Sequence, residues 1–246
     1  KPGEGIPIGV VYKQSGNAYF QAGVEGFQKA ADELGFEFMH DGPEDSSNDG
    51  QERIIRNYID QGVDVLCISA NDAAGLVDVC KEAMEKGIYV LSWDAKVDAE
   101  GRNLDIEPAS AKVIGITQLE SIAESVGYEG KIAIVSAGAT APNQNLWISY
   151  IQEEFAANEK YANMEPLPTV YGDDDYTKSY DVTKALIDAN PDLKGIITPT
   201  TVGGPAVSKC IMDEGLTGKV KVTGLTLATD MAEYIHAGIA DATFLW

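Results

Sequence analysis

Short apolar runs rich in β-branched residues alternate with longer helical patterns along the whole chain, and this alternation constrains the fold more than any other feature. In the first half we expect strands over residues 6–12, 36–40, 63–69 and 89–93, separated by helices over 22–34, 51–61 and 74–86. Parallel strands need crossovers of this length. The sequence therefore predicts an α/β fold in which helices cover both faces of a parallel sheet.

The second half of the chain repeats this order of elements. We expect strands over 131–135, 169–171, 194–198 and 219–224, and helices over 144–158, 177–190, 206–214 and 230–237. In each half a helix ends at a turn, Gly62 or Asn190-Pro191, and leads directly into a buried strand. The repeated order predicts two similar doubly wound lobes, each with its own parallel sheet.

The join between the halves falls where Glu107 and Pro108 interrupt the pattern, before a helix expected over 111–125. We expect an N-terminal lobe over 1–108 and a C-terminal lobe over 109–242, connected by a hinge. The apolar residues 243–246 read as a strand that joins the N-terminal lobe, together with residues beyond the given sequence. The sequence is therefore expected to be truncated at this end, and its start reads as that of a mature or trimmed chain without a visible signal peptide.

Charge and cysteine usage narrow the function. The 39 acidic residues exceed the 18 basic ones, and a net charge of −21 with no basic run argues against nucleic acid as a partner. No apolar run is long enough to span a bilayer. Cys67, Cys80 and Cys210 lie in apolar patterns and are expected to be free, buried and inert, a usage more typical of a cytosolic or an anaerobic extracellular protein.

Motifs of several enzyme classes are missing. No Gly-x-Gly-x-x-Gly follows a strand, and neither a P-loop nor a Gly-x-Ser-x-Gly elbow occurs. His40 and His236 lack a nucleophile or metal partner and are expected at the surface. The run 173–175 lacks the EF-hand spacing, so a solvated turn is expected there. We therefore expect a protein that is not an enzyme and uses neither a cofactor nor a metal.

Ligands of open parallel sheets bind beyond the carboxyl ends of the strands, which makes the polar residues after each strand the candidate binding residues. In the first lobe these are Lys13 (with 14–15), Asn71-Asp72 and Asp94, and Lys13 and Asp94 are the residues we single out. In the second lobe they are Asn143, Gln144, Pro199 and Thr201. An ammonium, a carboxylate and amides suit neighbouring hydroxyls, because each hydroxyl donates and accepts at once.

Aromatic rings near these positions are candidates for contact with ring carbons of a ligand, namely Tyr19, Phe20, Trp93 and Trp147. Each candidate also has a structural interpretation. Lys13 is an exposed rim lysine in that interpretation, Asp94 caps a loop, and Asn143 is the N-cap of the helix over 144–158. The remaining candidates would be first-turn or turn residues (Gln144, Pro199, Thr201), and for Trp147 a core position is favoured.

Several segments resemble periplasmic sugar-binding proteins of the ribose-binding type. They are residues 62–64 with 68–72, 86–88 with 92–94, and 191–197. The resemblance covers essentially the whole chain. It implies an extracytoplasmic protein, periplasmic or a cell-surface lipoprotein, whose two lobes close by hinge rotation on a small ligand in the cleft between them. It also implies a monomer that works with the membrane subunits of an ABC importer.

The effector domain of a lactose-repressor-type regulator shares this core and is the remote alternative. Such a regulator needs a helix-turn-helix and a basic face, and the given sequence has neither.

Two branches of the sugar-binding family are similar to this sequence at the candidate positions. The pattern of the autoinducer-2 receptors has a lysine and an aspartate at the positions of Lys13 and Asp94. It differs at two places: it has Asp-Gln where this chain has Asn143-Gln144, and Pro-x-Ala where this chain has Pro199-Thr200-Thr201. The rhamnose-binding proteins share Asn143-Gln144-Asn145, the run 199–203 and the run 171–174. Four positions match the autoinducer-2 pattern, and they favour autoinducer-2 as the ligand: Lys13, Asp94, Gln144 and Pro199. Rhamnose or another monosaccharide is the alternative.

Overall fold

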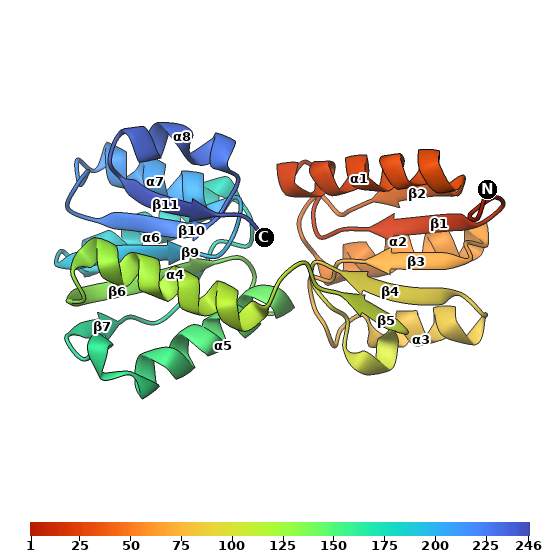
Figure 1. Ribbon diagram of the computed structural model, residues 1–246, viewed down its shortest axis with the longest axis horizontal. Helices are drawn as coiled ribbons and strands as arrows, with labels where there is room; N and C mark the ends of the chain where they lie inside the picture. Colours follow the sequence, from red (N-terminus) through yellow and green to blue (C-terminus); the bar gives the residue numbers. More distant parts are fainter. The chain divides into compact units, whose positions relative to one another are not determined.

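The computed structural model describes residues 1–246, which divide into two compact units (Figure 1). The first unit contains Lys1–Pro108 and Thr140–Asn143, and the second contains Ala109–Ala139 and Gln144–Trp246. Residues 243–246, which we expected in the first lobe, lie in the second unit. The reason is that Thr243 and Phe244 pair with Gly224 and Leu225 in the sheet of that unit.

The first unit is built on five parallel strands in the order β2-β1-β3-β4-β5. The strands are β1 (Pro7–Val11), β2 (Glu37–Asp41), β3 (Val65–Ile68), β4 (Tyr89–Trp93) and β5 (Leu104–Ile106). The helices are α1 (Ala18–Leu34), α2 (Asn48–Gln61), α3 (Val77–Glu85) and the 3₁₀ turn η1 (Ala99–Gly101).

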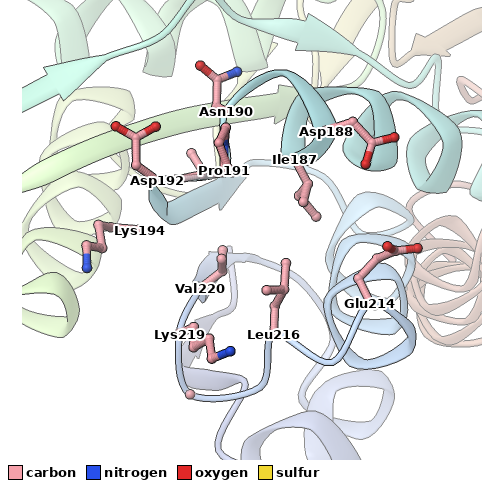
Figure 2. A pocket seen from close by; sticks show the side chains of 12 residues that line it. Ile187, Asp188, Asn190, Pro191, Asp192, Lys194, Glu214, Leu216, Lys219 and Val220 are labelled. Atoms are coloured by element: carbon pink, nitrogen blue, oxygen red, sulfur yellow. The ribbon is translucent and has the colours of Figure 1, made fainter.

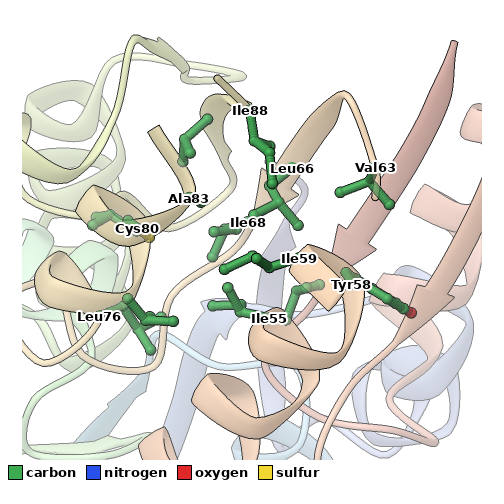
Figure 3. Close-up of a cluster of buried hydrophobic side chains, with 14 of the residues drawn as sticks. Ile55, Tyr58, Ile59, Val63, Leu66, Ile68, Leu76, Cys80, Ala83 and Ile88 are labelled. Carbon is green, nitrogen blue, oxygen red and sulfur yellow. The ribbon is translucent and has the colours of Figure 1, made fainter. Parts of the chain in front are cut away.

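The two faces of this sheet are covered by different helices, because successive strand residues point to opposite sides. On one face, α2 and α3 pack on the strands, with a core that includes Ile55, Tyr58, Leu66, Ile68, Leu76 and Cys80 (Figure 3). On the other face, the ring of Phe27 on α1 lies 5.5 Å from that of Trp93 and 5.9 Å from that of Phe38. With helices on both faces, the unit is doubly wound as predicted.

Helix ends in this unit follow local side-chain chemistry. Asn17 caps α1 by accepting a hydrogen bond from the Tyr19 N–H at 3.0 Å, and Ser47 caps α2 through the Gly50 N–H at 3.1 Å. Both helices end at a glycine, Gly35 or Gly62, whose positive φ suits the left-handed cap. The caps place the helix starts at Ala18 and Asn48, several residues earlier than the sequence pattern indicated.

The second unit repeats the topology of the first. Its strands are β6 (Gly130–Ser136), β7 (Met164–Pro166), β8 (Val170–Tyr171), β9 (Leu193–Thr198), β10 (Lys221–Leu225) and β11 (Ala240–Phe244). They follow the order β11-β10-β9-β6-β7, and β8 also pairs with β6. β7 and β8 both pair with β6, so they share the edge position that β2 has beside β1. With these two counted as one, in both sheets the first strand lies between the second and the third, followed outward by the fourth and fifth. The predicted duplication is confirmed at the level of strand order.

Five helices and one 3₁₀ turn complete the second unit: α4 (Ala111–Val126), α5 (Pro142–Ala157), η2 (Glu159–Tyr161), α6 (Tyr176–Ala189), α7 (Gly203–Asp213) and α8 (Ala228–His236). Trp147 on α5 is 1% exposed and packs with Ile114 and Leu225, which confirms the favoured core interpretation and removes it from the candidate contacts. The three cysteines are free and buried, and both histidines are exposed, as predicted. None of the helices combines the length and apolar character needed to cross a membrane.

Candidate functional site

The polar candidates of the first unit gather at the carboxyl ends of three adjacent parallel strands. Lys13 follows β1, Ser69 follows β3, and Asp94 follows β4. The chain changes direction across the sheet between β1 and β3, since β2 lies on one side of β1 and β3 on the other. Such a switch point leaves an opening beyond the strand ends where open α/β sheets bind ligands.

Lys13 is buried, with 2% of its surface exposed, so the interpretation as a solvated rim lysine is wrong. Its Nζ donates a hydrogen bond to Oδ1 of Asn143 at 2.7 Å. The backbone of Lys13 is also held, because Nδ2 of Asn71 donates to its carbonyl oxygen at 2.9 Å. A buried ammonium needs such partners, and hydroxyl oxygens of a ligand are of the same acceptor type.

Asn143 belongs to the first unit, with Lys13, and is 8% exposed. Helix α5 begins at Pro142, a residue whose fixed φ suits the first helical position. Asn143 is therefore the second residue of α5, so the interpretation as an N-cap is wrong. Its side-chain oxygen accepts the hydrogen bond from Lys13.

Asp94 is 8% exposed and is held in a tight turn directly after β4, where its φ is 63°. This left-handed conformation is uncommon for a residue with a side chain, though aspartate tolerates it better than most. The hydroxyl of Ser69 donates a hydrogen bond to Oδ2 of Asp94. Tyr19 is the second partner: burial, and then the charge of Asp94 and a hydrogen bond to it, raise the pKa of the Tyr19 hydroxyl. The carboxylate is thus oriented by two hydroxyl donors.

Aromatic rings lie beside these polar groups. The ring of Tyr19 meets that of Phe20 edge-on at 5.3 Å, and Phe20 stacks on Tyr12 at 5.6 Å. Phe20 also contacts Trp93 at 5.9 Å, edge to face. Tyr19 is half-buried, whereas Phe20 is 3% exposed. Phe20 therefore packs against Tyr19 and Trp93 as a buried ring, and Tyr19 and Trp93, both half-buried, keep exposed surface.

The candidates of the second unit lie at the corresponding end of its sheet. Gln144, on α5, is buried, and Pro199 and Thr201 follow β9, the first buried and the second half-buried. Between them, Thr200 donates a hydrogen bond from Oγ1 to Oδ1 of Asp174. Asp174 is buried, so the prediction of a fully solvated turn over 173–175 is wrong at this residue.

Sequence reasoning missed two residues of the first unit. Ser69 donates a hydrogen bond to Asp94, and the buried side chain of Gln51 hydrogen-bonds to the loops after β1 and β3. Gln51 is a polar residue on the helical face that carries Ile55, Tyr58 and Ile59, and all four are buried. A glutamine inside an apolar stripe is a signal that the sequence contains. Ser69 offered no comparable signal, because serine is common at the end of a strand.

A cavity of about 650 Å³ lies elsewhere, at the amino ends of β9 and β10 in the second unit (Figure 2). Its lining includes the apolar residues Ile187, Leu216 and Val220 and charged residues such as Asp188 and Lys219. Pro199 and Thr201 follow the opposite end of β9, so this cavity is separate from the candidate site. No group of histidine, cysteine and acidic side chains in the chain has the arrangement of a metal site.

The sequence and the topology match a known group of proteins. The family model described as "Periplasmic binding protein domain" matches residues 8–246 of this chain. The chain belongs to the periplasmic binding protein family. This confirms the predicted family and its fold of two lobes with parallel sheets.

Three relatives illustrate the range of the family around this chain. An ABC transporter solute-binding protein from Clostridium phytofermentas, solved with bound L-rhamnose, is 35% identical, with a TM-score of 0.96 over 99% of this chain and 77% of the other. LsrB from Clostridium saccharobutylicum, solved in complex with AI-2, is 25% identical, with a TM-score of 0.90 over 96% and 75%. The D-ribose/D-allose-binding protein of Pseudomonas aeruginosa is 25% identical over 88% of this chain and 69% of its own length.

Proposed function

We propose that this chain is the solute-binding protein of an ABC importer, works outside the cytoplasm, and captures a small neutral molecule rich in hydroxyls without altering it. The observation that carries the proposal is the buried polar set at the strand ends of the first unit. Lys13 with Asn143, and Asp94 with Ser69 and Tyr19, are held in place beside an aromatic ring. Relatives solved with sugars on the same fold support it.

The chemistry of the set matches that of hydroxyl groups. Asp94 can only accept hydrogen bonds and Lys13 can only donate them, whereas an amide such as Asn143 does both. A vicinal diol can satisfy all three, because each of its hydroxyls has one donor and two acceptor sites. Hydrogen bonds to charged groups are worth about 1.5–3 kcal/mol each, and micromolar affinity needs roughly 8 kcal/mol in total. Gln144, Pro199 and Thr201, at the strand ends of the second unit, stay proposed ligand-binding residues.

Among such ligands we favour L-rhamnose. The protein solved with L-rhamnose shares 35% of its residues with this chain, against 25% for the protein solved with AI-2. Asn143 supports this preference, since it accepts the hydrogen bond of Lys13 without the negative charge that the autoinducer-2 pattern has there. Autoinducer-2 is the second candidate, because Lys13, Asp94, Gln144 and Pro199 are retained from its pattern.

A thermal-shift and calorimetry series with L-rhamnose, autoinducer-2, D-ribose and D-allose tests the function. A ligand that binds only the folded protein raises the melting temperature in proportion to ln(1 + [L]/Kd). We expect L-rhamnose to give the largest shift and to be recovered unchanged after incubation. A larger shift with autoinducer-2 would assign the second candidate, and chemical conversion of the sugar would indicate an enzyme. No shift with any of the four would refute the proposed function.

A lysine pair provides the matched control for the site. Lys13→Met keeps the length of the side chain but removes the ammonium that reaches Asn143, so we expect at least a tenfold loss of affinity for the bound sugar. Lys81→Met removes an exposed ammonium that pairs with Glu100 on the surface, and we expect unchanged affinity. Equal affinities of the two variants would remove Lys13 from the site.

A further inference from the structure

Gln51 is completely buried, with 0% of its surface exposed, although it is a polar residue in the first turn of α2. It lies one turn before Ile55 on the helical face that packs into the core of the first unit. Burying an amide is costly unless its donors and acceptor are all hydrogen-bonded. Its role therefore follows from what its side chain binds.

The side-chain amide of Gln51 joins the ends of two neighbouring strands. Its Nε2 donates to the carbonyl oxygen of Tyr12, after β1, at 3.1 Å, and to that of Ser69, after β3, at 2.7 Å. Its Oε1 accepts from the backbone N–H of Asn71 at 2.8 Å. One side chain thus fixes three backbone groups on two loops, just beyond the point where the Ser69 N–H donates to the carbonyl oxygen of Val11 at 2.8 Å.

Each of these backbone groups belongs to a residue that leads directly to the candidate binding site. Tyr12 precedes Lys13, and Asn71 donates from Nδ2 to the carbonyl oxygen of Lys13. Ser69 donates from its hydroxyl to Asp94. Lys13 and Asp94 follow strands β1 and β4, which are not neighbours, so their spacing depends on the loop after β3 between them.

We propose that Gln51 is a positioning residue for the ligand site, one that sets the spacing of Lys13 and Asp94 through the loops after β1 and β3 and does not touch the ligand. This inference rests on the proposed function. Binding groups must be held close to their productive geometry by the residues behind them. Loss of these ties is therefore expected to weaken sugar binding tenfold or more.

Gln51→Glu tests this inference through its pH dependence. A carboxylate there has no donor and faces the carbonyl oxygens of Tyr12 and Ser69, which raises its pKa, whereas the protonated carboxyl can donate to one of them. We expect the affinity for L-rhamnose, or for autoinducer-2 if that is the ligand bound, to fall tenfold or more at about pH 8. Part of this loss should be recovered at about pH 5, where the new group is protonated.

The pH profile is taken as a ratio to the wild type at each pH. This division removes the effect of titratable groups common to both proteins, namely Lys13, Tyr19 and Asp94 at the site and Tyr12 with His40, whose side chains lie 3.4 Å apart. Ile55→Val is the control for a loss of packing on the same face of α2. A purely structural role of Gln51 predicts that both variants lower the melting temperature and leave affinity alone, with no pH-dependent ratio, and this result would overturn the inference. If Gln51→Glu does not fold, Gln51→Met is measured against the same control.

A measurement without ligand separates this inference from the proposed function. Amide hydrogen exchange of residues 12–15 and 69–72 is compared between the wild type and Gln51→Glu at about pH 8. We expect faster exchange in these two loops and unchanged exchange in β2. If the wild type binds no sugar but the loops loosen, the proposed function is wrong while the positioning role of Gln51 stands. Unchanged exchange in both loops would count against that role whatever the ligand.

Discussion

At the scale of single residues, the site depends on a backbone conformation as well as on side-chain chemistry. Asp94 has a φ of 63°, and its carboxylate accepts from Ser69 and Tyr19. Asparagine adopts this conformation about as readily as aspartate, whereas alanine pays roughly 1–2 kcal/mol. Substitution by asparagine or by alanine can therefore separate the effect of the negative charge on binding from the effect of backbone strain on stability.

We expect Asp94→Asn and Asp94→Ala both to weaken sugar binding by at least tenfold, because each removes the negative charge that the hydroxyls would meet. Only Asp94→Ala should also lower the free energy of unfolding by about 1 kcal/mol relative to Asp94→Asn. Calorimetry gives the affinities and urea denaturation the stabilities. Wild-type affinity in Asp94→Asn would show that the charge is not used for binding.

Sequence patterns predict the place of a polar residue in the fold well where it follows a strand, and less well where burial decides. The positions of Lys13 and Asp94 at strand ends could be predicted because both follow strands of a parallel sheet. The burial of Asp174 beside Thr200 could not, since a run of three aspartates is usually solvated. The role of Asn143 was also ambiguous, because the sequence pattern does not show that α5 begins at Pro142 rather than two residues later.

At the scale of elements, α1 lies close to the sheet because a glycine faces Trp93. A Cβ at Gly23 would lie 2.8 Å from the indole ring, whereas a Cβ at Gly26, one turn along, would meet nothing within 4 Å. Replacing a helical glycine by alanine otherwise stabilises by roughly 0.8–1 kcal/mol. The two glycines therefore form a matched pair in which helix propensity is constant and packing differs.

We expect Gly26→Ala to raise the free energy of unfolding by about 0.5–1 kcal/mol and Gly23→Ala to lower it by about 1 kcal/mol or more, since the ring has to move. Urea denaturation provides both values. Trp93 directly precedes Asp94, so Gly23→Ala should also weaken sugar binding and change the tryptophan fluorescence. Equal stabilisation by the two variants would show that the Trp93 ring moves away from the added methyl group without a loss of stability.

Helix α4 is linked to η2 by a carboxylate whose ionisation contributes to stability. Burial opposes the charge of Glu120, but hydrogen bonds from Lys160, Tyr128 and Tyr161 outweigh it and lower its pKa to about 2. Because the unfolded pKa is about 4.3, this contribution is present above about pH 5 and is lost as the pH falls toward 2. The group is partly exposed, which reduces the expected contribution to about 1 kcal/mol.

Glu120→Gln should therefore lower the free energy of unfolding by about 1 kcal/mol at neutral pH. It should also reduce the fall of this free energy as the pH is lowered from about 5 to about 2. Urea denaturation across this range measures both effects. Glu124→Gln, an exposed substitution on the same helix, is the control and should leave this fall unchanged. An unaltered slope in Glu120→Gln would place the acid sensitivity elsewhere.

The alternation of strands and helices, repeated in the two halves, was the part of the fold that the sequence pattern predicted best, because buried parallel strands need long helical crossovers between them. The strands β5 and β7 were missed, since three residues are too few to show an alternating pattern. The position of residues 243–246 was also missed. An apolar strand carries no mark of the sheet that it joins, and only its pairing with β10 assigns it to the second unit.

At the scale of the whole molecule, the dominant physical quantity is the excess of 21 negative charges. Self-repulsion of this kind destabilises the compact state and is screened by salt. Surface ion pairs such as those of Arg56 with Glu52 and Glu82 act in the opposite sense, but exposed pairs contribute little. The two effects therefore predict opposite signs for the influence of salt on stability.

We expect the urea midpoint to rise between about 10 mM and about 500 mM NaCl, because repulsion among the excess acids outweighs the ion pairs. Over the same range, the affinity for L-rhamnose should stay constant within about twofold, since a neutral sugar gains nothing from the long-range field. Calorimetry at the two salt concentrations distinguishes the binding of a neutral sugar from the binding of a charged molecule. An anion would bind more tightly as salt screens the acidic surface, and a cation more weakly, so a salt-dependent affinity would redirect the search from sugars to charged solutes.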